Sequence, residues 1–283
     1  MIQERLKALR AEMEKRGITV YVVPTADFHE SEYVGDHFKA RKFITGFTGS
    51  AGTAVITLDE AGLWTDGRYF VQAENQLKDS TVTLYRMGEE GVPTVDEFVK
   101  DRLKEGGCLG FDGRVVNGTW GGKLEKIAAE KNVSMHVTED LIDLIWEDRP
   151  ALSKQPLFIL EEKYSGKSTA DKIGDLRKAM KENGADVHIL TSLYDIAWLL
   201  NIRGNDIDYV PVVLSYLVLN ETECIWFLQE EVVDDKIRAY LEENHITTKP
   251  YDAIYDYVPE IPADAVVLMN RGTVNYRIVN SLD

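Results

Sequence analysis

Two nine-residue segments of this chain are near copies of one another, LRAEMEKRG at residues 9–17 and LRKAMKENG at residues 176–184. Around the first copy, apolar residues recur at spacings of three and four, at Ile2, Leu6, Leu9 and Met13. That spacing is the period of one face of a helix. Because Gly17 is placed where glycine commonly ends a helix, the pattern predicts a helix over residues 2–16, repeated in the second half of the chain.

The similarity extends beyond this helix. A buried strand is expected at residues 20–23 after the first copy and at residues 187–191 after the second. Further on, AVIT at residues 54–57 followed by Leu63-Trp64 resembles LVLN at residues 217–220 followed by Ile225-Trp226. Two matches in the same order predict a duplicated domain. Superposition of the copies is expected to bring Trp64 close to Trp226.

The order of the predicted elements indicates an α/β fold. Strands at residues 53–58 and 62–66 are joined by a tight connection and are therefore expected to be antiparallel. A helix from about Gly67, a strand at residues 82–86 and further alternation to Val137 favour parallel neighbours elsewhere. We expect each domain to contain one mixed sheet flanked by helices.

The domain boundary is predicted between two prolines. Arg149-Pro150 and Gln155-Pro156 bracket a short linker, because a residue that precedes proline avoids the helical conformation. The predicted domains are residues 1–152 and 156–283. The second domain ends in a strand at residues 265–269 and a helix at residues 273–282, and the alternating plan would add one more strand after Asp283. The chain is therefore expected to be shortened.

Charge and composition exclude several classes of protein. The formal net charge is -16 over 283 residues, which argues against binding to nucleic acid because acidic side chains repel phosphates. No run of 18 apolar residues predicts a membrane span, and the charged N-terminus lacks the apolar core of a secretory signal. We expect a cytoplasmic protein. Cys108 and Cys224 each lie in an apolar run without a partner at metal-binding spacing, so both are predicted to be reduced core thiols.

Three polar motifs resemble binding sites, but each lacks part of its pattern. The glycine-rich GFTGSAG at residues 46–52 precedes a predicted strand, whereas a phosphate loop opens a helix. His29-Glu30 begins like a zinc-peptidase motif but has no second histidine at the required spacing, which favours a polar loop with Asp27 as a cap. Asn205-Asp206-Ile207-Asp208 lacks the glycine and glutamate of a calcium loop. No metal site is predicted.

Arg68 is the residue with the strongest indication of function. In WTDGRYF at residues 64–70, Asp66 is expected to cap a helix whose first turn contains Arg68. A cation gains nothing from the helix dipole at that end. Arg68 is therefore either solvated without a role or held for a ligand. The five histidines are scattered and offer no catalytic set.

Longer strings resemble a known family. DFHESEY at residues 27–33, RKFITGFTGSAGTA at residues 41–54 and LWTDGRYF at residues 63–70 are similar to the first domain of long-form Xaa-Pro aminopeptidases, in the creatinase/prolidase superfamily. WEDRP at residues 146–150 resembles the end of that domain. DIAWLLNIRGNDI at residues 195–207 resembles the family's middle domain. The resemblance covers nearly the whole chain.

The resemblance implies the N-terminal, non-catalytic region of a cytosolic, dimeric metallopeptidase that removes an N-terminal residue when proline is second. Such enzymes hold two divalent metals, usually manganese, in a C-terminal "pita-bread" domain, and no residue here matches those ligands. The resemblance implies that Arg68 reaches the active-site cleft and helps to hold substrate, with His29 and Asp27 as further substrate-binding candidates. The fragment alone is expected to be inactive and free of cofactor. Its expected partners are its own catalytic domain, a second copy of the full-length protein and a peptide with proline second. The alternatives are a free-standing binding module, a self-contained hydrolase using His29, or the N-terminal region of a prolidase-like dipeptidase.

Overall fold

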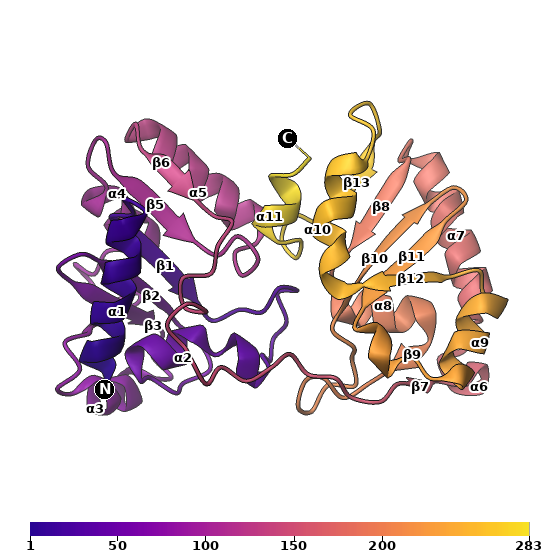
Figure 1. Cartoon of the computed structure of the whole chain (residues 1–283), viewed down its shortest axis with the longest axis horizontal. Coiled ribbons are helices and arrows are strands. Elements are labelled where there is room, and N and C mark those ends of the chain that lie inside the picture. The colour runs from indigo at the N-terminus through magenta and orange to yellow at the C-terminus, as the bar shows by residue number, and fades with distance from the viewer. Residues whose placement is uncertain (283) are drawn as a thin grey trace. The chain divides into compact units, whose positions relative to one another are not determined.

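The computed structural model describes residues 1–282, which form two compact units (Figure 1). Unit 1 contains Met1–Asp27 and Asp36–Ala151, and unit 2 contains Phe28–Gly35 and the chain from Leu152 onward. The short segment Phe28–Gly35 therefore packs with unit 2, although the sequence predicted that residues 1–152 stay together. No helix among residues 1–282 is both long and apolar enough to cross a membrane.

Unit 1 is built on one six-stranded mixed sheet. Its elements in chain order are α1 (Ile2–Lys15), β1 (Val20–Pro24), the 3-10 helix η1 (Asp36–Phe38), α2 (Ala40–Thr45), β2 (Thr53–Thr57), β3 (Ala61–Thr65), α3 (Phe70–Leu77), β4 (Thr83–Arg86), α4 (Val95–Arg102), β5 (Cys108–Phe111), α5 (Gly118–Glu130) and β6 (Ser134–His136). The strand order is β4-β3-β2-β1-β5-β6. The pairs β1–β2 and β2–β3 are antiparallel and the other three are parallel, which confirms the predicted mixed sheet.

Unit 2 repeats this plan. Its elements are β7 (Phe158–Ile159), α6 (Glu162–Ser165), α7 (Thr169–Glu182), β8 (Val187–Leu190), α8 (Leu193–Leu200), β9 (Ile202–Arg203), β10 (Ser215–Asn220), β11 (Cys224–Leu228), η2 (Glu230–Val232), α9 (Asp235–Glu243), β12 (Thr247–Pro250), η3 (Tyr251–Ala253), α10 (Ile254–Tyr257), η4 (Val258–Glu260), β13 (Val267–Leu268) and α11 (Tyr276–Val279). The main sheet has the order β12-β11-β10-β8-β13, with antiparallel pairs at β8–β10 and β10–β11 and parallel pairs at both ends. This order and these directions match those of β4-β3-β2-β1-β5, so the predicted duplication is confirmed at the level of topology. The described residues of unit 2 contain no counterpart of β6, and β13 and α11 are shorter than the predicted strand 265–269 and helix 273–282.

One hydrogen bond is made both by α1 in unit 1 and by α7 in unit 2. Arg10 Nε in α1 donates to the carbonyl oxygen of Thr57 at 2.9 Å, and Arg177 Nε in α7 donates to that of Asn220 at 3.0 Å. Each acceptor is the last residue of the strand that enters the central hairpin. The repeated Leu-Arg of the sequence thus contributes a leucine to the packed face of the helix and an arginine that binds the hairpin turn.

A second repeated contact joins α1 to α2 in unit 1 and α7 to α8 in unit 2. Arg5 Nη1 donates to the carbonyl oxygen of Phe43 at 2.8 Å, and its guanidinium carbon lies 4.1 Å from the centre of the Phe43 ring. Lys172 Nζ donates to the carbonyl oxygen of Trp198 at 2.7 Å and lies 4.6 Å from that ring. Both acceptors are near the C-terminal end of a helix, where a cation is favoured by the dipole and by the free carbonyl groups.

The two tryptophans occupy neighbouring but not equivalent positions of their hairpins, because the sequence match of Leu63-Trp64 with Ile225-Trp226 is displaced by one residue in the structure. The backbone N–H of Thr57 donates to the carbonyl oxygen of Glu60, and that of Asn220 donates to the carbonyl oxygen of Glu223. These matching bonds align the two hairpins at an offset of 163 residues (57 to 220) rather than 162. Trp226, opposite Leu217, then corresponds to Leu63, opposite Ala54. Because successive side chains of a strand point to opposite faces, a shift of one residue places Trp64 on the other face of its sheet.

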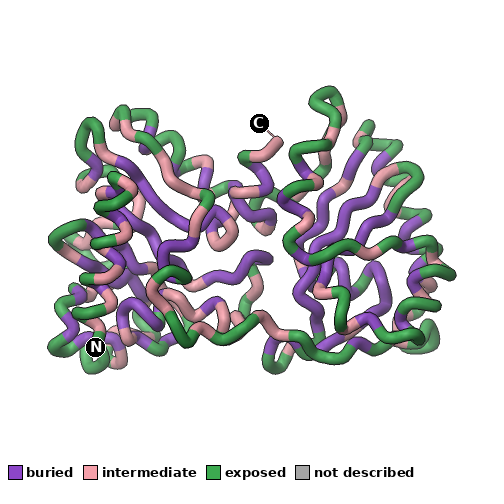
Figure 2. The backbone as a smooth tube through the Cα atoms, in the orientation of Figure 1, coloured by how far each residue is buried: buried purple, intermediate pink, exposed green. Residues whose placement is uncertain are grey.

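Each unit has its own hydrophobic core between the sheet and its helices (Figure 2). In unit 1, Leu6, Leu9 and Met13 of α1 pack against the sheet and are almost fully buried. Burial of one such side chain contributes about 1.5–3 kcal/mol, so these three residues account for much of the attachment of α1. In unit 2, Ile173 and Met180 of α7 occupy the corresponding positions.

Candidate functional site

Arg68 lies in a turn between β3 and α3. The helix begins at Phe70, so the prediction that Arg68 belongs to the first helical turn is wrong. Asp66 does not cap α3. Instead its Oδ1 accepts a hydrogen bond from the backbone N–H of Arg68 at 3.0 Å, and its carbonyl oxygen accepts one from the N–H of Tyr69 at 3.0 Å. These bonds close a tight turn at the carboxyl end of β3, as an aspartate side chain commonly does.

The guanidinium of Arg68 forms a two-point ion pair with Asp66. Nε donates to Oδ1 and Nη2 donates to Oδ2, each at 2.8 Å. Arg68 therefore has an ion-pair partner within its own turn. The pair is nevertheless at the surface, since the side chain of Arg68 is 69% exposed and that of Asp66 is 37% exposed. Hydrogen bonding by Arg68 lowers the pKa of Asp66 to about 2, so the carboxylate is ionised at neutral pH.

The glycine-rich loop at residues 46–52 packs beside this turn. Ser50 Oγ and the hydroxyl of Tyr69 are hydrogen bonded at 2.6 Å. Thr48 is bound by α3, because its N–H donates to Gln76 Oε1 at 2.9 Å and its hydroxyl accepts from Gln72 and Gln76. These contacts fix the loop against α3 and against Tyr69, the residue that follows Arg68.

The same loop is organised from inside by Arg41, which is only 4% exposed. Arg41 Nη1 donates to the carbonyl oxygen of Phe47 at 2.6 Å, Nη2 donates to that of Gly49, and Nε donates to Thr25 Oγ1 at 2.9 Å. Burial lowers the pKa of Arg41 to about 10. The loop therefore directs carbonyl groups towards an internal cation, whereas a phosphate loop directs N–H groups towards an anion.

His29 is buried in unit 2 rather than placed at a surface. The side chain is 2% exposed and belongs to the segment Phe28–Gly35. Nδ1 lies 2.9 Å from the carbonyl oxygen of Thr191, Nε2 lies 2.6 Å from the hydroxyl of Tyr251, and the ring lies 4.5 Å from that of Tyr216. Both ring nitrogens are occupied by protein groups, which supports a structural position.

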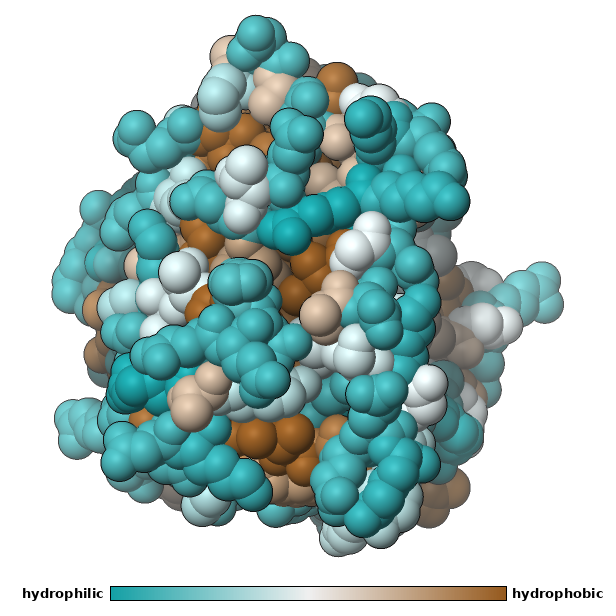
Figure 3. All heavy atoms as spheres, turned by 90° about the vertical axis from the view of Figure 1, so that its right-hand side faces the viewer, coloured by the Kyte–Doolittle hydropathy of each residue, from teal (hydrophilic) through white to brown (hydrophobic). Residues whose placement is uncertain are grey.

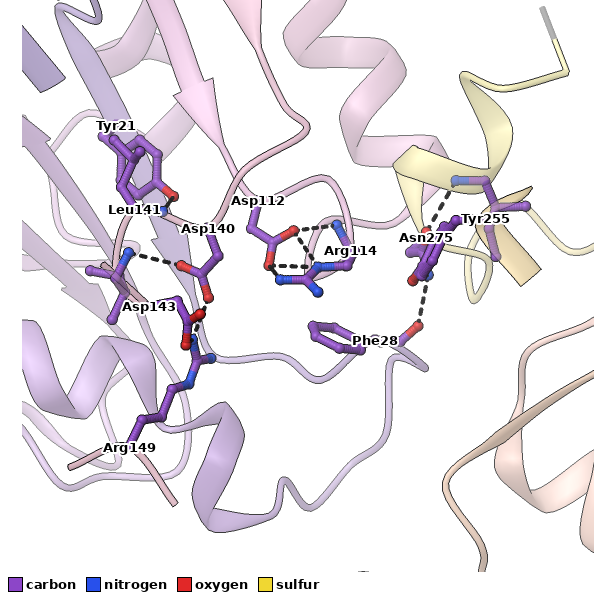
Figure 4. Close-up of polar contacts among 12 residues, drawn as sticks. Tyr21, Phe28, Asp112, Arg114, Asp140, Leu141, Asp143, Arg149, Tyr255 and Asn275 are labelled. Carbon is purple, nitrogen blue, oxygen red and sulfur yellow. Dashed lines mark hydrogen bonds and ion pairs between the residues drawn. The ribbon is translucent and has the colours of Figure 1, made fainter. Parts of the chain in front are cut away.

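The carbonyl oxygen next to His29 is also bound within unit 2. Asn275 Nδ2 donates to the carbonyl oxygen of Phe28 at 3.1 Å and to the hydroxyl of Tyr255 at 3.2 Å (Figure 4). Asp27, the remaining predicted candidate, is the last residue of unit 1 before this segment and is buried. The substrate-binding roles of Arg68, His29 and Asp27 stay predictions.

A buried cluster of charged residues in unit 1 was not predicted. Asp112, directly after β5, pairs with Arg114, whose Nε and Nη2 each lie 3.0 Å from a carboxylate oxygen (Figure 4). Burial raises the pKa of Asp112, and the negative charge of Asp140 adds to this effect while Arg114 opposes it. Only the aspartate after a buried strand hinted at such a pair in the sequence.

The second half of this cluster fastens the end of unit 1. Arg149 Nη1 donates to Asp140 Oδ2 at 2.6 Å and lies 3.2 Å from Asp143 Oδ1, while Nε donates to the carbonyl oxygen of His37 at 2.9 Å. Each carboxylate is thus engaged by an arginine. No group of three or more side chains suited to a metal ion is found among residues 1–282. The arginine of the WEDRP string therefore has a structural role in unit 1.

Unit 2 has a different residue at the position that corresponds to Arg68. The hairpin offset of 163 places Gln229 at the position of Asp66 and Glu231 at that of Arg68. Glu231 is exposed and pairs with Lys154. By contrast, the cationic side chains of α1 that bind backbone carbonyl groups, Arg5 and Arg10, have counterparts in α7, Lys172 and Arg177.

The face of unit 2 in Figure 3 is mostly hydrophilic, with apolar residues visible in separate patches.

Comparison with known proteins defines the class of this chain. Residues 5–145 match the family described as Creatinase/Prolidase N-terminal domain, and residues 148–283 match a second family of the same description. The chain thus consists of two creatinase/prolidase N-terminal domains and belongs to that family.

The relatives are more specific. The chain is 42% identical over 255 residues to a probable Xaa-Pro aminopeptidase P of Sordaria macrospora, covering 89% of this chain and 41% of that protein. It is 35% identical to aminopeptidase P2 of Arabidopsis thaliana, covering 99% of this chain and 40% of that protein. The crystal structure of X-prolyl aminopeptidase from Caenorhabditis elegans, described as a cytosolic enzyme with a di-nuclear active site, matches all of this chain and 49% of that one, with a TM-score of 0.94 and 32% identity. The chain is therefore homologous to the N-terminal region of these proteins and spans about 40% of the length of the curated relatives.

Proposed function

We propose that this chain is the non-catalytic N-terminal region of a cytoplasmic, metal-dependent Xaa-Pro aminopeptidase, which removes the first residue from peptides with proline second. The observation that carries this proposal is similarity along the whole chain to such enzymes, at 42% identity to one relative and a TM-score of 0.94 to another. The enzyme of Caenorhabditis elegans is described as cytosolic, which supports this location.

In this proposal, the metal chemistry belongs to a catalytic domain outside these two units. The relative with a di-nuclear active site is about twice as long as the matched region, since the match covers 49% of it. Two divalent ions, taken as manganese, would polarise the peptide carbonyl there and supply the attacking hydroxide. Residues 1–282 offer no cluster that fits such ions. The partners are the catalytic domain, a second copy of the full protein and the peptide.

The contribution of unit 1 to substrate binding is assigned to Arg68. Its planar guanidinium suits the oxygen atoms of a peptide carbonyl or carboxylate group. Its exposure at the surface and its presence in unit 1 alone, with Glu231 at the corresponding position of unit 2, support this role. For Asp27 and His29, burial supports a role in holding the segment Phe28–Gly35 instead of direct contact with the peptide.

The proposed function is tested by the activity of two purified polypeptides, this chain alone and the same domains followed by a catalytic domain. The longer protein is expected to bind manganese and cleave a tripeptide with proline second, but not a matched tripeptide with alanine second. The chain alone is expected to do neither. Turnover by the chain alone would contradict the proposal, and cleavage of Xaa-Pro dipeptides only would instead indicate a prolidase-like parent.

A further inference from the structure

We infer that Asp66 is a positioning residue for Arg68, holding the guanidinium so that its free donors form a binding site for the oxygen atoms of the peptide substrate. This inference rests on the proposed function, because it explains how Arg68, the residue proposed to bind the peptide, is oriented.

The geometry of the ion pair leaves one side of the guanidinium available. An arginine side chain carries five N–H donors in a planar fork. Asp66 accepts one from Nε and one from Nη2. Both donors of Nη1 and the second donor of Nη2 remain, and these lie at the end of the side chain, where a planar carboxylate or carbonyl group can bind. Asp66 is the one carboxylate paired with Arg68 among residues 1–282.

The carboxylate of Asp66 is itself held by the turn. Its Oδ1 accepts the backbone N–H of Arg68 as well as the side-chain Nε. The residue before it, Thr65, is fully buried at the end of β3, and its hydroxyl donates to the carbonyl oxygen of Ala51 at 2.7 Å. The buried end of β3 thus holds Asp66 in place, and Asp66 in turn orients the guanidinium of Arg68.

A second contact restricts the guanidinium from another side. The guanidinium carbon lies 5.3 Å from the centre of the ring of Tyr69, within the range of a cation–π interaction. Tyr69 is fixed in turn by the hydrogen bond of its hydroxyl to Ser50. The exposed Arg68 therefore has a defined direction, which an unpaired surface arginine would lack.

Such positioning has a physical benefit for binding. A free arginine side chain populates many rotamers, and a ligand that fixes it must offset the lost entropy. The ion pair with Asp66 removes part of this loss before the ligand arrives. Unit 2 has Gln229 and Glu231 at the corresponding positions, and this segment includes the 3-10 helix η2, so the aspartate–arginine pair is particular to unit 1.

The test uses the full-length enzyme with four variants, Asp66→Asn, Asp66→Glu, Arg68→Ala and the double variant Asp66→Asn/Arg68→Ala. Asp66→Asn is expected to raise KM for a proline-second tripeptide by roughly threefold to tenfold, with kcat changed by less than about twofold, because it removes order and not the binding group. Asp66→Glu is expected to recover part of the loss. Asp66→Asn is expected to have no further effect when Arg68 is already alanine, since it acts only through that side chain.

The control is Glu130→Gln, which removes the same charge from another exposed ion pair of unit 1, with Lys100, and is expected to leave KM unchanged. If Arg68→Ala raises KM but Asp66→Asn does not, the positioning role of Asp66 is wrong while the role of Arg68 stands. Equal effects of Asp66→Asn in both backgrounds would also overturn it. If neither substitution changes KM, the assignment of peptide binding to Arg68 fails, and the inference fails with it.

Discussion

Three arginines of unit 1 lie in different environments that the sequence alone does not separate. Arg10 binds a hairpin carbonyl, Arg41 is buried among loop carbonyls, and Arg68 is exposed beside Asp66. The sequence indicated Arg68 because it was expected at the start of a helix, where a cation gains nothing from the dipole, and because it lies in a string that resembles a known family. The role of Arg41 could not be predicted, because its acceptors are backbone groups whose direction depends on the folded loop.

At the same scale, the two cysteines agree with the prediction of core thiols. Both are buried and neither is in a disulfide. Burial raises the pKa of Cys224 to about 12, and a thiol reacts as its thiolate. In a Cys108→Ala variant, whose sole thiol is Cys224, we therefore expect almost no reaction with a thiol reagent at pH 8. Full reaction is expected after unfolding in guanidinium chloride. Rapid stoichiometric labelling of the folded variant would show that Cys224 is accessible and ionisable.

Among the elements, helices with several regularly spaced apolar residues were predicted closely. The positions of strands along the chain were predicted better than the alignment of the strands of one unit with those of the other. The helix over residues 2–16 is observed as Ile2–Lys15, and the antiparallel hairpin is observed at residues 53–65. The alignment of Trp64 with Trp226 was displaced by one residue. Two short apolar sequences look alike at either offset, whereas in a strand a shift of one residue moves each side chain to the opposite face of the sheet. The start of α3 was predicted too early because Asp66 and Gly67 form a separate turn.

The glycines that end α1 and α7 provide a matched test of the repeated element. Gly17 and Gly184 have φ of 67° and 65°, and a Cβ at either position would meet no atom within 4 Å. Gly17→Ala and Gly184→Ala are therefore expected to destabilise the protein by similar amounts, about 1–2 kcal/mol, through backbone strain alone. Gly174→Ala, inside α7 and also uncrowded, is expected to stabilise it by about 0.5–1 kcal/mol. Denaturant unfolding measures all three, and a neutral effect at residues 17 and 184 would contradict this account.

At the scale of the molecule, the sequence predicted two α/β domains of one plan, and the topology confirms that plan. The sequence did not predict that Phe28–Gly35 packs with unit 2. The reason is physical, since a polar loop carries no periodic pattern and the partners of His29 lie as far as 222 positions along the chain. Local propensity contains no information on such contacts.

The position of His29 makes a prediction about unit 2. His29→Ala leaves the buried carbonyl group of Thr191 and the hydroxyl of Tyr251 without this partner, which is expected to cost about 1–3 kcal/mol. Hydrogen exchange should become faster near Thr191 and Tyr251 in unit 2, while β2 and β3 of unit 1 keep their protection. His245→Asn, at an exposed histidine of unit 2, is the control. Loss of protection confined to unit 1 would show that the segment does not support unit 2.

The passage of Phe28–Gly35 into unit 2 also has a consequence for biosynthesis. The ribosome makes His29 long before Tyr251, and at 5–20 residues per second the 222 positions between them take roughly 10–40 s. During that interval unit 1 of the nascent chain can fold, while the segment Phe28–Gly35 cannot yet make its contacts with Tyr251. Chaperones and proteases therefore have a defined period in which to bind an exposed Phe28 and His29, and a pause in translation before residue 251 would extend that period.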